Sequence, residues 1–525
     1  MEMKFITESL NLYLVAAIIL YFWVCRIVNS LWLRPRRLEK RLKSQGFKGN
    51  PYTFWYGDLK DAAKMTTDVQ SKTINLEDDI DPYVFPFHHH VVQKYGKRCY
   101  MWNGAKPRIF VMDPVWIREI LQKHEIFVRL YTNPLNKLLI TGLIAHEGES
   151  WARKRRILNS AFTITKLKDM IPVMHISCME LVEKWQSMFP DTGSLEIDVW
   201  PYFSDMSADV ISRTAFGSNY EEGRKIFLLQ REQVRLVSIL SRSIYIPGQR
   251  FLPTKTNERM KEISKEIKAI LMGIIKRKEE AMRRARNLDD KSNNDLLGIL
   301  LETNYEEQKG GNGKEVGMTI EEVIEECILF YFAGQETTSS LLVWTMVLLS
   351  IHQDWQAQAR EEVLEVFGKR KPDFDGLLQL KKVHMILYEV LRLYSSAPLI
   401  VRVTAKEIKL GDVTLPKGLE LVLPFLFVHH DKEIWGEDAN KFKPERFAQG
   451  VTKAAKDGQL GAFFPFGFGP RICIGQNYST VEAKLALALI LQHFSFKLSP
   501  SYEHAPVPIL TLQPKCGAKV ILNKI

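Results

Sequence analysis

The stretch 463-FFPFGFGPRICIGQ-476 places one cysteine, Cys473, in a glycine-rich loop directly before an apolar helical segment. The first turn of a helix has free backbone N–H groups and a partial positive charge, and both stabilise a thiolate that holds a metal. Gly469 and Gly475 let the backbone pass close to a flat ligand, and Arg471 offers a cation for a carboxylate on that ligand. A buried inert cysteine would explain the sulfur but not these neighbours.

The other cysteines are scattered, with no CxxC pair and no spacing typical of a disulfide framework or a zinc site. They are Cys25, Cys99, Cys178, Cys327 and Cys516. A reducing compartment is therefore expected. Because no second cysteine or histidine lies at metal-ligand spacing from Cys473, the loop favours a single axial thiolate over a zinc or iron–sulfur site.

The composition is that of a folded protein with a large core, since 46% of the 525 residues are hydrophobic and 25% are charged. The net charge of +11 favours acidic partners or an anionic membrane surface. The basic stretch at 276–286 interleaves acids and lacks aromatic residues. It therefore indicates a solvated helix face, and no nucleic-acid partner is expected.

An apolar stretch at residues 12–33 is interrupted only by Arg26, Asn29 and Ser30, and it reaches the roughly 20 residues that cross a bilayer. Lysines and arginines follow it closely, whereas Lys4 is the one basic residue before it. The positive-inside rule then places everything after residue 34 in the cytosol. We expect a membrane anchor at 1–33, a catalytic domain at 34–525 and no cleaved signal peptide.

The remaining pattern predicts a mainly helical domain with a smaller, late β portion. Thr319 and Glu322 form a capping box before a helical pattern that runs to about residue 350, and further helices are expected at 354–368 and 380–395. Strands are expected at 399–405, 408–418, 419–428 and 519–525. Polar stretches at 287–295 and 304–317 indicate surface loops, and the histidines at 88–90 favour a structural role over metal binding.

The long helix carries a group of small and polar residues at 333–338, AGQETT. Ala333 and Gly334 lack bulk, so a ligand can lie against the helix at this point. Thr337 can bond back to its own helix and open a groove, and Glu336 beside it is an acid, so the two could pass protons. A structural pair of threonines would also explain part of this pattern.

Together these residues resemble the cytochromes P450. Phe466, Gly469, Arg471, Cys473 and Gly475 match the FxxGxRxCxG signature of that family. Three further matches follow the family's chain order: AGQETT at 333–338, EVLR at 389–392 and PERF at 444–447. The resemblance covers the whole chain and implies the cytochrome P450 fold.

The resemblance also implies a cofactor and its contacts. It implies haem b (iron protoporphyrin IX) with Cys473 as the axial iron ligand, while Ala333 and Gly334 lie against the cofactor. Trp151, Arg155 and Arg402 match residues that face a haem propionate in the family. Glu389, Arg392 and Arg446 match a buried group that holds the fold around the cysteine loop.

The implied activity is monooxygenation, in which the thiolate favours O–O cleavage and Thr337, helped by Glu336, delivers protons. No nicotinamide or flavin motif occurs, so electrons are expected from NADPH–cytochrome P450 reductase at the endoplasmic reticulum membrane. Lys453 and Lys456 near the cysteine loop suit an acidic partner of this kind. A peroxide-rearranging enzyme of the same fold typically loses the helix threonine and alters the cysteine loop, and a non-catalytic haem-binding or steroid-binding protein would need neither Glu336 nor Thr337.

Finer resemblance, carried by stretches such as GFKGNPY at 46–52 and HQDWQAQAREEV at 352–363, is to the plant group that includes secologanin synthase. It implies a small hydrophobic terpenoid substrate, with pentacyclic triterpenoids ahead of iridoids and gibberellins. The segment 127–144 is expected to face the substrate. Its polar exceptions, Arg129, Tyr131 and Lys137, fit a substrate contact and a surface position equally well.

Overall fold

A computed structural model describes residues 2–129, 137–191, 193–218, 220–241, 248–286, 295–302, 317–456 and 461–525. The two polar stretches expected to be surface loops lie outside the described residues, apart from Asp295 and Gly317, and so does Tyr131.

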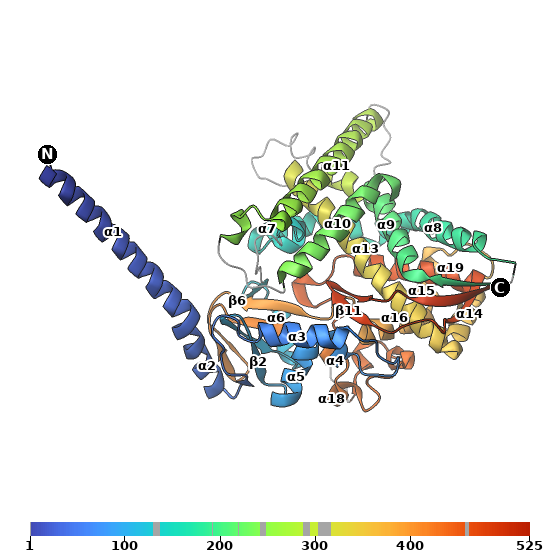
Figure 1. Cartoon of the computed structure of the whole chain (residues 1–525). Coiled ribbons are helices and arrows are strands. Elements are labelled where there is room, and N and C mark those ends of the chain that lie inside the picture. Colours follow the sequence, from blue (N-terminus) through green and yellow to red (C-terminus); the bar gives the residue numbers. More distant parts are fainter. Residues whose placement is uncertain are drawn as a thin grey trace.

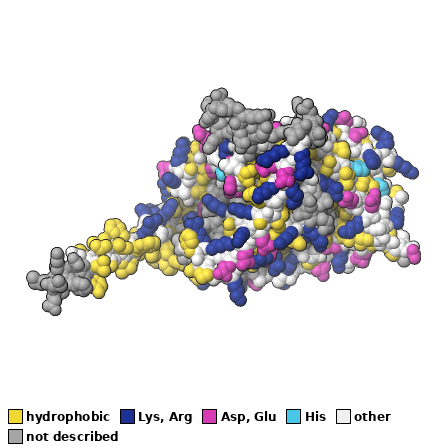
Figure 2. Space-filling model, turned by 90° about the horizontal axis from the view of Figure 1, so that it is seen from above, with side chains coloured by type: hydrophobic (Ala, Val, Ile, Leu, Met, Phe, Trp, Pro, Cys, Tyr) yellow, Lys and Arg dark blue, Asp and Glu magenta, His cyan; other side chains and the backbone are white. Residues whose placement is uncertain are grey.

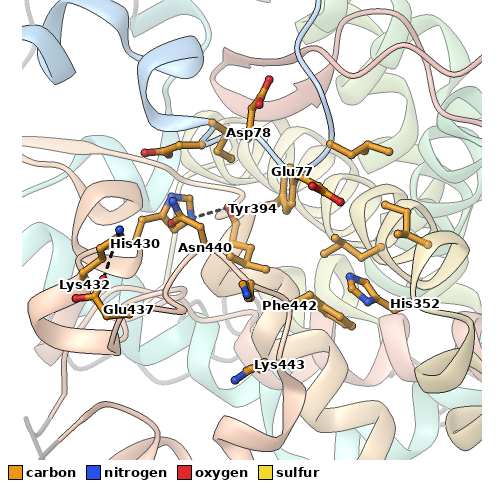
Figure 3. A pocket seen from close by; sticks show the side chains of 17 residues that line it. Glu77, Asp78, His352, Tyr394, His430, Lys432, Glu437, Asn440, Phe442 and Lys443 are labelled. Atoms are coloured by element: carbon orange, nitrogen blue, oxygen red, sulfur yellow. Dashed lines mark hydrogen bonds and ion pairs between the residues drawn. The ribbon is translucent and has the colours of Figure 1, made fainter.

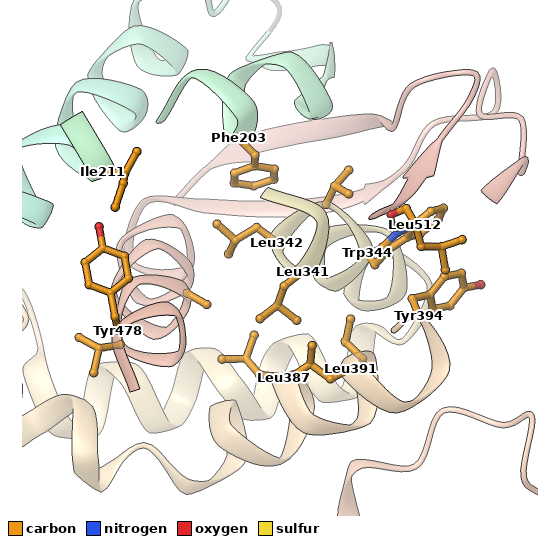
Figure 4. Packing of buried hydrophobic residues seen from close by; sticks show 14 of the residues in the cluster. Phe203, Ile211, Leu341, Leu342, Trp344, Leu387, Leu391, Tyr394, Tyr478 and Leu512 are labelled. Atoms are coloured by element: carbon orange, nitrogen blue, oxygen red, sulfur yellow. Dashed lines mark hydrogen bonds between the residues drawn. The ribbon is translucent and has the colours of Figure 1, made fainter. Parts of the chain in front are cut away.

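The helix α13 (Ile320–Ile351) crosses the body of the molecule and confirms the predicted long core helix (Figure 1). Its capping box is formed: the Glu322 N–H donates to Thr319 Oγ1 at 3.2 Å, and the Thr319 N–H donates to Glu322 Oε2 at 3.0 Å. Figure 4 shows Leu341 and Leu342 of this helix among apolar side chains of its neighbours, including Phe203 and Leu387. Because it is surrounded, α13 is apolar on nearly all sides rather than amphipathic.

Most of the other described elements are also helices. The longer ones are α2 (Arg34–Ser44), α3 (Leu59–Gln70), α5 (Pro86–Tyr95), α6 (Pro114–Gln122), α7 (Gly148–Asn159), α8 (Ile164–Ser187), α9 (Val199–Phe216), α10 (Tyr220–Ser241), α11 (Lys255–Arg286), α14 (Gln353–Phe367), α16 (Lys381–Leu393) and α19 (Gln476–His493). Short helical turns are α4 (Asp81–Val84), α15 (Phe374–Gln379), α17 (Phe425–His429) and α18 (Lys432–Trp435). The helices predicted at 354–368 and 380–395 are confirmed as α14 and α16.

The described strands form one larger sheet and three small ones. The six-stranded sheet has the order β1-β2-β3-β9-β6-β4, and the others are β10-β13-β5, β11-β12 and β7-β8. The strands are β1 (Lys48–Gly49), β2 (Cys99–Asn103), β3 (Lys106–Phe110), β4 (Phe127–Arg129), β5 (Ser194–Asp198), β6 (Ile400–Thr404), β7 (Ile408–Leu410), β8 (Val413–Leu415), β9 (Glu420–Leu423), β10 (Phe494–Leu498), β11 (Pro506–Ile509), β12 (Thr511–Pro514) and β13 (Lys519–Lys524).

Two expectations about strands need correction. The β portion is not only late, because β2 and β3 form a hairpin early in the chain, with Gly104 at φ +60° in its turn, and β3 pairs with β9. Asn103-Gly104 is a recognisable hairpin signal. The strand expected over 419–428 ends at Leu423, because Pro424 has no N–H for a ladder and caps the short helix α17.

The N-terminal helix α1 (Glu2–Val28) projects away from the body and continues through a turn at Asn29–Leu33 into α2 (Figure 1). Within Asn11–Ser44, the most apolar window has a mean hydropathy of 2.0 and none of it is buried in the protein. In Figure 2 its hydrophobic side chains gather along the projecting helix, whereas charges of both signs are interspersed over the visible face of the body. The helix therefore has the length and composition of a membrane span.

A buried ion pair joins α16 to the chain that follows α17. The Arg392 guanidinium donates to both Glu389 carboxylate oxygens, at 2.7 and 2.8 Å, and neither side chain is exposed. Arg392 also donates to the carbonyls of His429 and Ala439, at 2.8 and 2.5 Å. The Arg446 Nε atom lies 3.5 Å from Glu389, as the resemblance implies. These contacts order the segment that leads to the cysteine loop.

We predict that Arg392→Leu lowers the free energy of unfolding by about 3–5 kcal/mol, because Glu389 would be left as a buried, uncompensated charge. Lys43→Leu is the control. The Lys43–Glu39 surface pair, at 2.7 Å, should contribute about 0.5 kcal/mol at most to the free energy of unfolding. Urea unfolding of the detergent-solubilised protein measures both. Equal losses in the two variants would contradict the prediction.

Candidate functional site

The cysteine loop is held mainly by its own backbone before α19 begins at Gln476. The Cys473 N–H donates to the Phe466 carbonyl at 2.9 Å, and the Ile472 N–H donates to Gly469 at 3.1 Å. The Gly475 backbone also donates toward the Cys473 sulfur. This arrangement places the thiol at the N-terminal end of α19, as the sequence predicts.

The Cys473 side chain is exposed although it lies at the start of a buried helix. Burial by the surrounding protein raises the pKa of its thiol, whereas the Gly475 N–H and the Arg155 charge act in the opposite direction. The Cys473 thiol is thus accessible and yet surrounded by protein. Both observations are explained when the thiol faces a space inside the protein. The added Cβ of a residue at Gly467 would meet nothing within 4 Å, so this part of the loop borders open space too.

His429 connects the buried ion pair to this loop. Its Nε2 accepts the Phe464 N–H at 2.9 Å, so Nε2 carries no proton and Nδ1 donates to Ser395 Oγ at 2.8 Å. Its carbonyl accepts a hydrogen bond from Arg392. Burial, together with the charges of His430 and Arg392, lowers the pKa of His429 well below its ordinary value. Sequence reasoning missed this residue, because one histidine in an apolar stretch has no distinctive signal.

Thr337 is exposed although Glu336 and Thr338 beside it are buried, so its side chain faces open space in the middle of a core helix. Its hydroxyl donates to the Ala333 carbonyl at 2.8 Å, which is the back-bond expected from the sequence. Ala333 is half-buried on the same helix. The helix α19, which follows Cys473, packs against α13.

Gly334 has a packing role in this structure. A Cβ added there would lie 2.7 Å from Ile211 Cγ1, so the glycine lets α9 approach α13 closely. Gly469 has a similar explanation, because an added Cβ would lie 2.9 Å from the Leu121 carbonyl at the end of α6. The contact predicted between Gly334 and a cofactor stays a prediction.

Three of the predicted propionate contacts meet in one cationic cluster. The Arg471 guanidinium lies 4.5 Å from the centre of the Trp151 ring and donates to the His146 carbonyl at 2.8 Å. It also forms an ion pair with Glu147. Arg402 is 8% exposed and lies close enough for its charge to act on a histidine in the same cluster, His124.

His124 was missed by sequence reasoning. Its ring lies 4.8 Å from the Trp151 ring, and burial, followed by the Arg471 charge, lowers its pKa. The buried Nδ1 atom of His124 has no hydrogen-bond partner among the described residues. A ligand with an anionic edge would supply such a partner.

Arg155 lies on α7, four residues after Trp151. It donates from Nη1 to the Ile472 carbonyl at 2.8 Å and acts electrostatically on Cys473. In this structure Arg155 therefore supports the cysteine loop, and the propionate contact that the resemblance implies for Arg155 stays a prediction.

The donor set fits the implied haem. Cys473 offers one exposed thiol, Thr337 faces open space on a helix packed against α19, and the Arg402, Arg471 and His124 cluster suits two carboxylates. A single sulfur ligand suits an iron held mainly by a macrocycle, and the one metal-compatible group of three found among the described residues does not include Cys473.

A cavity of about 590 Å³ lies between the end of α13 and the segment 430–443 (Figure 3). None of the predicted site residues lines it. Asp79, Asp81 and His430 beside it are the one metal-compatible group found among the described residues, and it does not include the histidines at 88–90. His430 Nδ1 lies 2.8 Å from Asp81 and Nε2 lies 3.0 Å from the Leu393 carbonyl, so the ring is already bonded on both sides.

Comparison with known proteins places the chain among plant enzymes. The family model described as Cytochrome P450 matches residues 81–521. Cytochrome P450 72A397 of Kalopanax septemlobus is 54% identical over 503 residues, which cover 96% of each chain. The 7-deoxyloganic acid hydroxylase of Catharanthus roseus is 49% identical over 98% of each chain, and the 11-oxo-beta-amyrin 30-oxidase of Glycyrrhiza uralensis is 49% identical over 96% of each chain.

The solved structure titled "Retinoic acid bound cyanobacterial CYP120A1" matches with a TM-score of 0.72 at 24% identity. The match covers 91% of this chain and 98% of that one. It confirms the expected fold.

We predict that His429→Leu destabilises the protein by about 1–3 kcal/mol, because the Phe464 N–H would lose its acceptor in a buried position. The variant should also flatten the pH dependence of stability. Below its ordinary pKa of 6.5 the unfolded chain binds a proton at this ring that the folded chain excludes, so stability falls as pH falls. Urea unfolding between pH 7.5 and about 5 measures both effects.

His90→Leu is the matched control, since His90 is exposed on α5. It should change neither the stability nor its pH slope. A pH slope in His429→Leu equal to that of the parent protein would contradict the assigned neutral ring.

Proposed function

The chain belongs to the cytochrome P450 family, and from this premise we propose that it hydroxylates or further oxidises a terpenoid-derived plant metabolite, with a pentacyclic triterpenoid favoured. The observation that carries the proposal is the exposed Cys473 thiol, held in the family's signature loop at the start of α19. The alternative substrates are an iridoid, supported by the relative named 7-deoxyloganic acid hydroxylase, and a gibberellin.

We propose haem b as the cofactor. Cys473 would hold the iron, with the Gly475 N–H and the Arg155 charge favouring the thiolate form. Arg402, Arg471, Trp151 and His124 would hold the propionate edge. When bound, the haem supplies the oxygen activation and electron transfer that amino-acid side chains lack.

The side chains contribute positioning and protons. The Thr337 hydroxyl donates its hydrogen bond to the Ala333 carbonyl, so its oxygen can accept a hydrogen bond from a water in the open space beside it. Glu336 is the nearest acid along the helix, and burial raises the pKa of its carboxyl. An acid with a raised pKa holds a proton closer to neutral pH, which suits a donor. We assign proton delivery to Thr337 and Glu336.

We propose NADPH–cytochrome P450 reductase as the electron donor, with the chain anchored by α1 in the endoplasmic reticulum membrane and its body in the cytosol. Lys453 and Lys456, close to the cysteine loop in the chain, are exposed and suit an acidic docking face. The apolar, unburied α1 supports the anchor.

Product analysis by mass spectrometry tests the activity. Yeast membranes that hold this chain and a plant reductase are fed triterpenoid acids, iridoids and gibberellins. We expect a gain of one oxygen on a triterpenoid, and its loss in Cys473→Ala, because the thiolate is the only proposed protein ligand. Oxidation of iridoids alone would overturn the favoured substrate class. A reduced, CO-bound preparation that lacks the absorption band of a thiolate-ligated haem would overturn the whole proposal.

We predict that Thr337→Ala lowers product formed per NADPH by on the order of 10²-fold and releases hydrogen peroxide instead, because a proton relay is lost. Ser339→Ala is the matched control, since Ser339 makes the same back-bond, to Gln335 at 2.7 Å, but is buried. Equal uncoupling in both variants would show that the back-bond, rather than the exposed hydroxyl, matters.

A further inference from the structure

Glu336 is turned toward the C-terminal hairpin β11–β12. Its side chain is 8% exposed, and its Oε2 accepts hydrogen bonds from Gln513 Nε2 at 2.6 Å and from Thr511 Oγ1 at 3.3 Å. Gln513 Nε2 also donates to Thr511 Oγ1 at 3.0 Å. The Gln513 amide thus donates one hydrogen bond to Glu336 and one to Thr511. The Thr511 hydroxyl donates its own hydrogen bond to the Glu336 carboxylate.

This arrangement is complete only when Glu336 Oε2 acts as an acceptor. Burial raises the pKa of Glu336, whereas the Arg231 charge and the two hydrogen bonds from β12 act against that rise. Arg231 on α10 lies 3.6 Å from Asp205 of α9, and β12 contributes only uncharged groups. The hairpin therefore supplies the direct hydrogen bonds that favour the ionised form.

Leu512, which lies between Thr511 and Gln513, also bonds the hairpin to α13. The Leu512 carbonyl accepts from Ser340 Oγ at 2.8 Å and from Trp344 Nε1 at 2.9 Å (Figure 4). The Leu512 N–H donates to the Ser396 carbonyl at 3.3 Å, and Ser396 Oγ donates to the Thr337 carbonyl at 3.3 Å. A displacement of β12 would therefore be felt at both Glu336 and Thr337.

The turn of the hairpin reaches the segment expected to face the substrate. Ile509 packs on an apolar cluster that contains Leu139 of that segment and Phe332 of α13. Leu510, in the turn, has φ +68° and is 44% exposed. A non-glycine residue in the left-handed region is strained, so this turn is held in place by its surroundings. A ligand that packs on the cluster would press on the hairpin.

We propose that Gln513 and Thr511 are positioning residues for the proton-donating acid, so that the substrate-side hairpin governs when Glu336 can deliver a proton toward Thr337. With both hydrogen bonds made, the carboxylate points at β12. When the hairpin shifts, the carboxylate takes up a proton from solvent and, as the carboxylic acid, gives that proton to a water near Thr337, which restores the carboxylate. The proposal rests on the monooxygenase function proposed above.

An infrared pH titration of the full-length, haem-loaded protein tests the inference without substrate or reductase. The band of the protonated Glu336 carboxyl is identified by its absence in Glu336→Gln. We expect Gln513→Leu and the double variant Thr511→Val/Gln513→Leu to raise the midpoint of this band by about one pH unit or more, because a charged form that loses its hydrogen bonds is protonated more easily.

Ser340→Ala is the matched control, because the Leu512 carbonyl keeps its bond from Trp344 Nε1, so the hairpin stays tied to α13, and no bond to Glu336 is removed. Its midpoint should equal that of the parent protein. An unmoved midpoint in the double variant, or an equal shift in Ser340→Ala, would overturn the proposal. Peroxide released per NADPH, with any substrate that gives product, should change several-fold in Gln513→Leu and not in Ser340→Ala. Because the titration needs no product, a failure of the substrate assignment leaves its result interpretable.

Discussion

The Glu389–Arg392 pair is the interaction on which the site depends. Two charges with no exposure are stable only when both partners and their hydrogen bonds are present, so the pair holds in place the carbonyls of His429, at the end of α17, and of Ala439. One of those carbonyls belongs to His429, whose ring accepts the Phe464 N–H at the start of the cysteine loop. The buried ion pair in α16 therefore helps to position the backbone of the loop that carries Cys473.

Residues 334, 336 and 337 of helix α13 face three different surroundings, because side chains rotate about the helix axis from one residue to the next. Each residue turns the side chain by about 100°, so neighbours in sequence face different surroundings. Gly334 meets α9, Glu336 meets β12 and Thr337 faces open space. An acid and an alcohol that are adjacent in the chain therefore lie in different environments. The hairpin side chains bond directly to the acid, whereas the hairpin reaches Thr337 only through Ser396 and the Thr337 carbonyl.

The arginines around the site also have different surroundings. Arg402 and Arg471 meet with His124 and Trp151 where an anionic edge would lie, whereas Arg155 alone acts on the thiol. The Arg155 cation beside the sulfur favours the thiolate, and the Arg402 and Arg471 cations suit carboxylates. This division is what a flat, iron-bearing ligand with two acidic arms requires.

By itself the sequence determined the local features: the loop around Cys473, the capping box of α13, the back-bond of Thr337 and the apolar anchor helix. Each depends on residues within a few positions of one another, where residue type and spacing specify the geometry. Only the tertiary structure decided which way Glu336 turns, which tautomer His429 adopts and why position 334 is a glycine. Those outcomes depend on partners that are distant in the chain: Gln513 and Ile211 lie more than a hundred residues from Glu336 and Gly334, and Phe464 lies 35 residues from His429. No local pattern specifies such contacts.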